Sequence, residues 1–280
     1  MSKWPLFILG LITPAIVIFL GIRESLHDRG LISALPESWD ANLGSAITSL
    51  IFIAFVSTLI FIFFKRLWLR IGLVVLLLLA TLFIAKVPWF IVVFGIMIPT
   101  LIHTTIFTGA FLLQGAIKNK RAWGFISFVV FIFCHILIFL LPISQGAAVL
   151  TDWIKEIYLA GEFYVLNYNL YSIFYDSSGG QLALDGAIGL KLQAFIAFAY
   201  TYHYLNWFSK TEVIKWHQIP KKWIVATLCV WIASVSLHLI DIKLGITAIG
   251  LISLMHVFLE FPLNHESFIF IGKRMLGRTT

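Results

Sequence analysis

The chain has 280 residues, of which 60% are hydrophobic and only 12% are charged. A soluble domain has about 45–50% apolar and about 25% charged residues, so the composition excludes a soluble globular protein. The formal net charge is +7, but the basic residues stand in short clusters between apolar runs. That pattern indicates membrane orientation rather than nucleic-acid binding. Cys134 and Cys229 lie within apolar runs, so neither a disulfide framework nor a thiolate zinc site is expected.

Apolar stretches recur along the whole chain at a length that suits membrane crossing. About 20 apolar residues cross the hydrocarbon core, and backbone groups in lipid must be paired within the segment, so each stretch is expected to be a helix. We predict an all-α, polytopic membrane helix bundle that forms a single domain over residues 1–280. The expected transmembrane helices, about eight in all, are 4–22, 43–64, 69–86, 88–117, 122–143, 185–209, 222–240 and 245–263.

The clusters of lysine and arginine set the expected orientation. Most of the 20 basic residues fall near residue 3, at 65–70, 118–121 and 210–222, and in the tail after 272. With an even number of spans these positions share one side, which the positive-inside rule makes cytoplasmic. We therefore expect both termini in the cytoplasm, and the plasma (inner) membrane of a bacterium as the location.

The longest stretch between expected spans is residues 144–184, which should lie outside the cell. Tyr164, Tyr168, Tyr171 and Tyr175 recur there at three- and four-residue spacing, which is one face of a helix. An aromatic stripe of this kind favours an amphipathic, interfacial helix at headgroup level. It could pack on the bundle or form a lid that contacts a substrate.

Ionisable side chains interrupt the late spans. At bilayer depth such a side chain costs at least about 2.5–3.5 kcal/mol, and it therefore marks a candidate site. His203 and Asn206 lie one turn apart in span 185–209, and His256 and Glu260 are one turn apart in span 245–263. Pro262 is expected to end that last helix.

His203, His256 and Glu260 are expected near the cytoplasmic leaflet, and further histidines should lie at the same level. His103 lies in span 88–117, which is long enough to bring it there. His217 and His265 should lie at the adjoining membrane surface and could form a second metal site. The predicted ligand set of the main site is His103, His203, His256 and Glu260. Mixed imidazole and carboxylate ligands suit non-haem iron, our first choice, or zinc, our second.

These residues favour an intramembrane metalloenzyme that acts on a lipid, an isoprenoid or another apolar molecule. Glu260 would serve as ligand or general base, and Asn206 would donate a hydrogen bond to the substrate or to a group that holds a metal ligand. We expect oxidative chemistry because the site lacks an obvious hydrolytic nucleophile, with metal-activated water as the competing mechanism. The sequence contains no P-loop, G-x-G-x-x-G, H-E-x-x-H or G-x-S-x-G motif that would name a reaction.

Two other functions stay open at this point. A proton-coupled transporter or channel would combine the inner residues with an outer layer made of His135, His238 and Asp241. A structural or assembly subunit would use the same polar residues only to hold its helices together, at about 0.6 kcal/mol per contact. The sequence does not choose the substrate or the oligomeric state.

Overall fold

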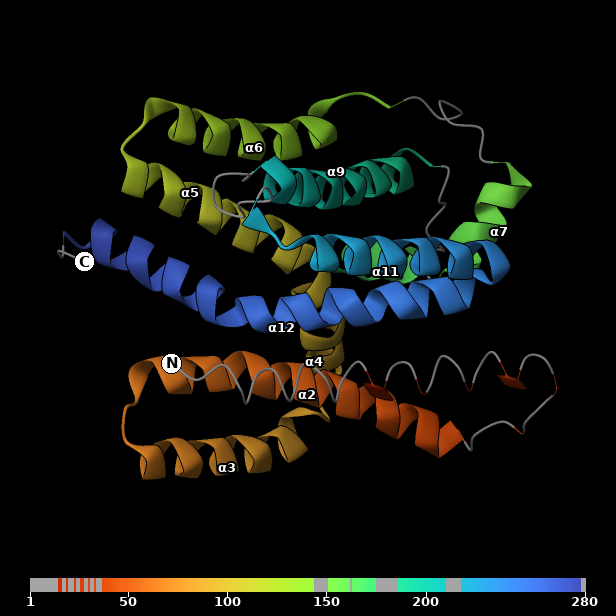
Figure 1. Cartoon of the computed structure of the whole chain (residues 1–280), viewed down its shortest axis with the longest axis horizontal. Helices are drawn as coiled ribbons and strands as arrows, with labels where there is room; N and C mark the ends of the chain where they lie inside the picture. The colour runs from red at the N-terminus through yellow and green to blue at the C-terminus, as the bar shows by residue number, and fades with distance from the viewer. Residues whose placement is uncertain are drawn as a thin grey trace. The chain divides into compact units, whose positions relative to one another are not determined.

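The computed structural model (Figure 1) is helical throughout the part of the chain that it describes. That part comprises residues 37–143, 151–161, 163–174, 186–209 and 218–277, together with a few isolated residues before 37. Its helices are α2 (Glu37–Phe63), α3 (Leu67–Ile84), α4 (Pro88–Phe90), the π-helix η1 (Ile91–Phe107), α5 (Thr108–Asn119), α6 (Ala122–Leu140), α7 (Asp152–Ala160), α8 (Phe163–Phe174), α9 (Ala187–Ser209), α11 (Lys221–Ile240) and α12 (Ile242–Met275). The all-α prediction is confirmed for these residues.

Among the described residues, six helical segments are long and apolar enough to cross a membrane. They are Ser45–Phe63, Leu67–Ile84, Ile91–Asn119, Ala122–Leu140, Lys221–Ile240 and Leu244–Met275. Segments of this length and composition are those of an integral membrane protein. The expected first span, 4–22, lies outside the described residues, and α9 is a helix that does not reach the same apolar length. Eight spans, the side of each terminus and the bacterial inner membrane therefore stay predictions.

The chain divides into two compact units. The first comprises Met1–Pro99 and Ala233–Thr280, and the second comprises Thr100–Ile232. A single membrane domain over the whole chain stays a prediction.

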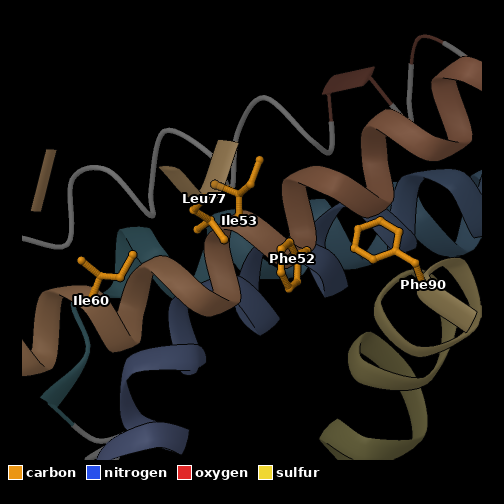
Figure 2. Close-up of a cluster of buried hydrophobic side chains, with 5 residues drawn as sticks. All are labelled: Phe52, Ile53, Ile60, Leu77 and Phe90. Carbon is orange, nitrogen blue, oxygen red and sulfur yellow. The ribbon is translucent and has the colours of Figure 1, made fainter. Parts of the chain in front are cut away.

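In the first unit, α2 and α3 form a helical hairpin, and α12 also packs against α2. Figure 2 shows the apolar cluster that joins α2 to its neighbours; it consists of Phe52, Ile53, Ile60, Leu77 and Phe90. The rings of Phe52 and Phe90 meet edge to face, with centroids 5.4 Å apart. Such pairs contribute about 0.5–1.5 kcal/mol beyond the area that they bury.

The turn between α2 and α3 is held by an arginine. Arg70 donates from Nε to the main-chain oxygen of Phe64, at 2.5 Å, and from Nη2 to that of Phe61, at 3.0 Å. The last carbonyl groups of a helix have no partner within the helix, and a cation is favoured there. Arg70 therefore satisfies the end of α2 and closes the hairpin.

The last helix corrects one prediction. We expected Pro262 to end the helix near 263, but α12 continues through Pro262 to Met275, and Figure 1 shows it as one ribbon. Proline removes one backbone hydrogen bond, which a helix within a membrane tolerates when neighbouring groups compensate. As a result Asn264 and His265 are buried helical residues rather than surface residues.

Residues 91–107 wind as a π-helix, with backbone hydrogen bonds from i to i+5. The expected depth of His103 depends on the α-helical rise of 1.5 Å per residue. That rise and the α-helical pattern of faces do not hold for this segment. The winding changes to α at Thr108, the first residue of α5.

In the second unit, α5 and α6 form a hairpin through Lys120, whose φ of 51° makes the left-handed turn. Gly124 permits their close approach, since a Cβ there would lie 2.9 Å from the Cα of Ala116. α6 also pairs with α9, and the contacts show that the two helices are antiparallel. Phe139 meets Phe195 near one end of the pair, and Phe131 meets Tyr202 further along it.

The expected external segment contains two short helices, α7 and α8, where we predicted one helix. Tyr164 and Tyr168 are exposed on α8, whereas Asn167 is buried. The amide of Asn167 donates to the hydroxyl of Tyr158 on α7. Burial raises the pKa of Tyr158 to about 12, so this hydroxyl is neutral at physiological pH. Tyr175 lies outside the described residues.

Candidate metal centre

Two histidines that lie 100 positions apart in the sequence meet inside the second unit. His103 on η1 is 2% exposed and His203 on α9 is 4% exposed. Their ring centroids are 4.8 Å apart, with the planes at 59°, and a nitrogen of one ring lies within 4.8 Å of a nitrogen of the other. Two imidazole nitrogens on one zinc ion, each at about 2.0–2.1 Å, are at most about 4 Å apart. The pair is therefore close to a ligating separation.

A threonine side chain links these two histidines. The hydroxyl of Thr108 lies 2.8 Å from Nδ1 of His203 and 3.5 Å from the main-chain oxygen of His103. Thr108 itself is 2% exposed, so water does not compete for these bonds. Metal-bound histidines commonly have their second ring nitrogen held by such a neighbour.

Thr104 and Thr105, the two residues that follow His103, are paired within their own helix. Thr104 bonds from its hydroxyl to the main-chain oxygens of Thr100, at 3.1 Å, and of Leu101, at 3.3 Å. Thr105 bonds to the same Leu101 oxygen at 2.5 Å. Hydroxyls that bond to a preceding carbonyl are compatible with an apolar helix. Thr108 differs from them because its hydroxyl reaches another helix.

The packing of α9 on α6 holds His203 in place. The ring of Tyr202, the preceding residue, lies 4.7 Å from that of Phe131. At the other end of the pair, Nζ of Lys191 donates to the main-chain oxygen of Phe139 at 2.6 Å. Contacts at both ends fix how far α9 is shifted along α6, and therefore the position of His203 along the axis of α6.

The remaining predicted residues of the main site lie on α9 and α12. Asn206 is half-buried one turn after His203, in the second unit. In the first unit, His256 is half-buried on α12 and Glu260 is 7% exposed one turn later. The roles of Glu260 and Asn206 stay predictions.

Within the second unit His103 and His203 offer two imidazoles to one metal ion, and His256 as a third ligand stays a prediction. Imidazole suits zinc, copper, iron and nickel, so the donors by themselves do not choose the metal. Three protein ligands are typical of catalytic zinc sites, in which the fourth position is left for water or substrate.

The structure changes the prediction for the second metal site. His217 lies outside the described residues. His265 is not at the surface as predicted, because it is 5% exposed within α12. Its Nε2 lies 2.9 Å from the main-chain oxygen of Phe55, and its ring packs 4.5 Å from the Phe55 ring. Since a carbonyl only accepts, Nε2 carries the proton and Nδ1 is the nitrogen left for a metal.

The residues of the predicted outer layer bond to main-chain groups. Nδ1 of His135 lies 2.8 Å from the main-chain oxygen of Phe131, and Nδ1 of His238 lies 3.2 Å from that of Ser234. Asp241 caps α12 by accepting a hydrogen bond from the backbone N–H of Leu244 at 3.0 Å. These bonds favour a structural role for the layer.

Thr108 is not among the candidate site residues identified from the sequence. It is one of several threonines close to His103 in the sequence. Its position five residues after His103 does not correspond to an α-helical neighbour, but it suits the wider turn of a π-helix. A histidine and a threonine at i and i+5, after a proline within an apolar run, is the signal that could have identified it.

Comparisons with protein-family models, with curated proteins and with solved structures found no match for this chain. The functional conclusion therefore depends on the site itself.

Proposed function

We propose that this protein is an intramembrane metalloenzyme in which His256 joins His103 and His203 to hold one metal ion. The observation that carries the proposal is the pair formed by His103 and His203. Two imidazoles from distant parts of the sequence lie ring to ring, both nearly inaccessible to solvent. A nitrogen of one ring lies within 4.8 Å of a nitrogen of the other, close to the separation of two imidazoles that bind the same ion.

The donor set supports a catalytic ion rather than a purely structural one. Three imidazoles leave at least one coordination position open for water or substrate. Iron is our first choice and zinc our second, since both accept imidazole together with the carboxylate that Glu260 would supply. Glu260 would act as an additional ligand or as the general base, and Asn206 would donate a hydrogen bond to the substrate.

The substrate that fits this setting is apolar. The residues of the site belong to helices rich in apolar residues, and the outward faces of α3 and α11 are almost entirely exposed apolar surface. A lipid or an isoprenoid can approach such a site from the side, within the bilayer. Oxidation is the favoured reaction class, and hydrolysis by metal-activated water is the competing one.

Metal analysis of the full-length protein, purified in detergent and loaded separately with iron and with zinc, tests this proposal. We expect about one ion per chain, lost in His203→Ala and in His256→Ala. His135→Ala is the matched control, because it also removes a histidine from within a span, one that bonds to the main chain. The control should keep its metal.

Two results would overturn the proposal. If the wild-type protein retains neither iron nor zinc, the proposed metal site is wrong. pH-dependent flux through the metal-free protein in liposomes would then favour the transporter. Equal metal content in the wild type, His203→Ala and His256→Ala would place any bound ion elsewhere.

A further inference from the structure

We infer that Thr108 is a positioning residue that makes Nε2 of His203 the metal-binding nitrogen. This inference rests on the proposed function and concerns the same site. It assigns a role to a side chain outside the set of three histidines. It also specifies which of the two His203 nitrogens the ion would meet.

The argument begins with the bond between Thr108 and His203. The hydroxyl oxygen lies 2.8 Å from Nδ1, which is a normal hydrogen-bond length. Nδ1 is therefore engaged with the threonine. A neutral imidazole has one nitrogen that donates and one that accepts, so the direction of this bond decides the state of Nε2.

The single hydroxyl proton of Thr108 has a second acceptor within reach. The main-chain oxygen of His103 lies 3.5 Å from the Thr108 hydroxyl and can accept this proton through a long hydrogen bond. The hydroxyl oxygen then accepts from Nδ1–H of His203, and the lone pair of Nε2 is left for the metal. The same hydroxyl thus connects the backbone of one ligand to the ring of another.

The opposite direction would exclude His203 from the site. If the hydroxyl donated to Nδ1, Nε2 would carry the proton and could not bind a cation. A metal ion at Nε2 would therefore lock Thr108 as the acceptor and His203 in the Nδ1–H form. Partners of this kind commonly change metal affinity by about 10–100-fold when they are removed.

Thr108→Val and Thr108→Ser test the inference, with Thr104→Val as a matched control. Valine removes the acceptor but keeps the branched shape, whereas serine keeps the hydroxyl. Thr104 is equally buried, at 2% exposed, and its hydroxyl bonds to carbonyls of its own helix. Both valine variants therefore lose a buried threonine hydroxyl, but only Thr108→Val loses the bond to His203.

The first measurement is the affinity for Zn²⁺ of the full chain, determined by competition with a chelator. Thr108→Val should weaken binding by about 10–100-fold, while Thr108→Ser and Thr104→Val should stay close to the wild type. The second measurement is nitrogen NMR of labelled histidine rings. It should show the Nδ1–H form of His203 in metal-loaded wild type.

The outcomes separate this inference from the proposed function. If the wild type binds no metal, the proposed function fails. If the wild type binds metal and Thr108→Val binds it equally well, or if NMR shows Nε2–H on His203 in the loaded protein, the inference fails and the proposed function stands. A purely structural Thr108 would give lower thermal stability with unchanged affinity and an unchanged NMR signature, which also overturns the inference.

Discussion

His203 in the second unit and His265 in the first have nearly equal exposure, 4% and 5%, yet they are held differently. Nε2 of His265 bonds to a main-chain carbonyl of α2. Nδ1 of His203 bonds to a threonine hydroxyl and its ring faces a second imidazole. A carbonyl can only accept, so the first bond has a fixed direction, whereas a hydroxyl can donate or accept. Burial alone therefore does not distinguish a ligand from a packing residue, and a carbonyl partner is compatible with either role. The feature that sets His203 apart is the second imidazole beside its ring.

The largest expected effect concerns the two histidines of the second unit. His103→Ala and His203→Ala should each weaken binding of Zn²⁺ by 100-fold or more, or on the order of 3 kcal/mol. The double variant should be little worse than either single one, because ligands of one ion act as a unit. Chelator competition on all three proteins measures this. Losses that simply add would show that the two rings do not share an ion.

Replacement of His265 tests the other side of the comparison. His265→Ala should lower the free energy of unfolding by about 3 kcal/mol, since a large buried ring is removed. His265→Phe keeps a ring against Phe55 and should lower it by only about 0.6 kcal/mol, the typical value for a hydrogen bond between membrane helices. Unfolding in a denaturing detergent measures both.

Metal content shows whether His265 is a metal ligand or only a packing residue. Both His265 variants should keep the same amount of metal as the wild type if His265 only packs α12 on α2. Loss of one of two bound ions would instead support the second site that we predicted with His217.

Close packing without an ionisable group provides a reference within the first unit. A Cβ on Gly95 would lie 2.6 Å from the hydroxyl oxygen of Thr48, a residue that is 3% exposed. Gly95→Ala should therefore lower the free energy of unfolding by about 2 kcal/mol through overpacking. In a Thr48→Ala background, Gly95→Ala should lower the free energy of unfolding by clearly less. An equal loss in both backgrounds would show that the added methyl group does not clash with Thr48.

A small effect of the opposite sign is expected at Asn264. Its side chain is fully buried, and in the part of the chain that the structure describes neither amide atom has a hydrogen-bond partner. Asn264→Leu should raise the free energy of unfolding by about 1 kcal/mol, because an unsatisfied buried amide is replaced by an apolar group of similar size. Thermal unfolding of this variant beside Asn264→Ala checks the sign. A lower stability for the leucine variant would mean that the amide has a polar partner, such as a buried water.

Much of the fold was predictable because span length and hydropathy depend on local sequence alone. The expected span 122–143 corresponds to α6, which ends at Leu140. Pro262 misled the prediction because the rule that proline ends a helix omits compensation by neighbouring helices. The link between Thr108 and His203 was not predictable from helical periodicity, because it depends on a π-helix that ends at Phe107 and on how α9 is shifted against α6.

The lysine on α9 has a consequence for how an ion would reach the site. Nζ of Lys191 bonds to a carbonyl in the last turn of α6, and a charged cap of this kind belongs at the water level. His203 is then about 18 Å further along α9, at 1.5 Å per residue. If α9 spans a hydrocarbon core about 30 Å thick, as the sequence predicts, about 12 Å separates the imidazole from the opposite face. The route that a metal ion would take to the proposed site is then shorter from the face at which α9 ends.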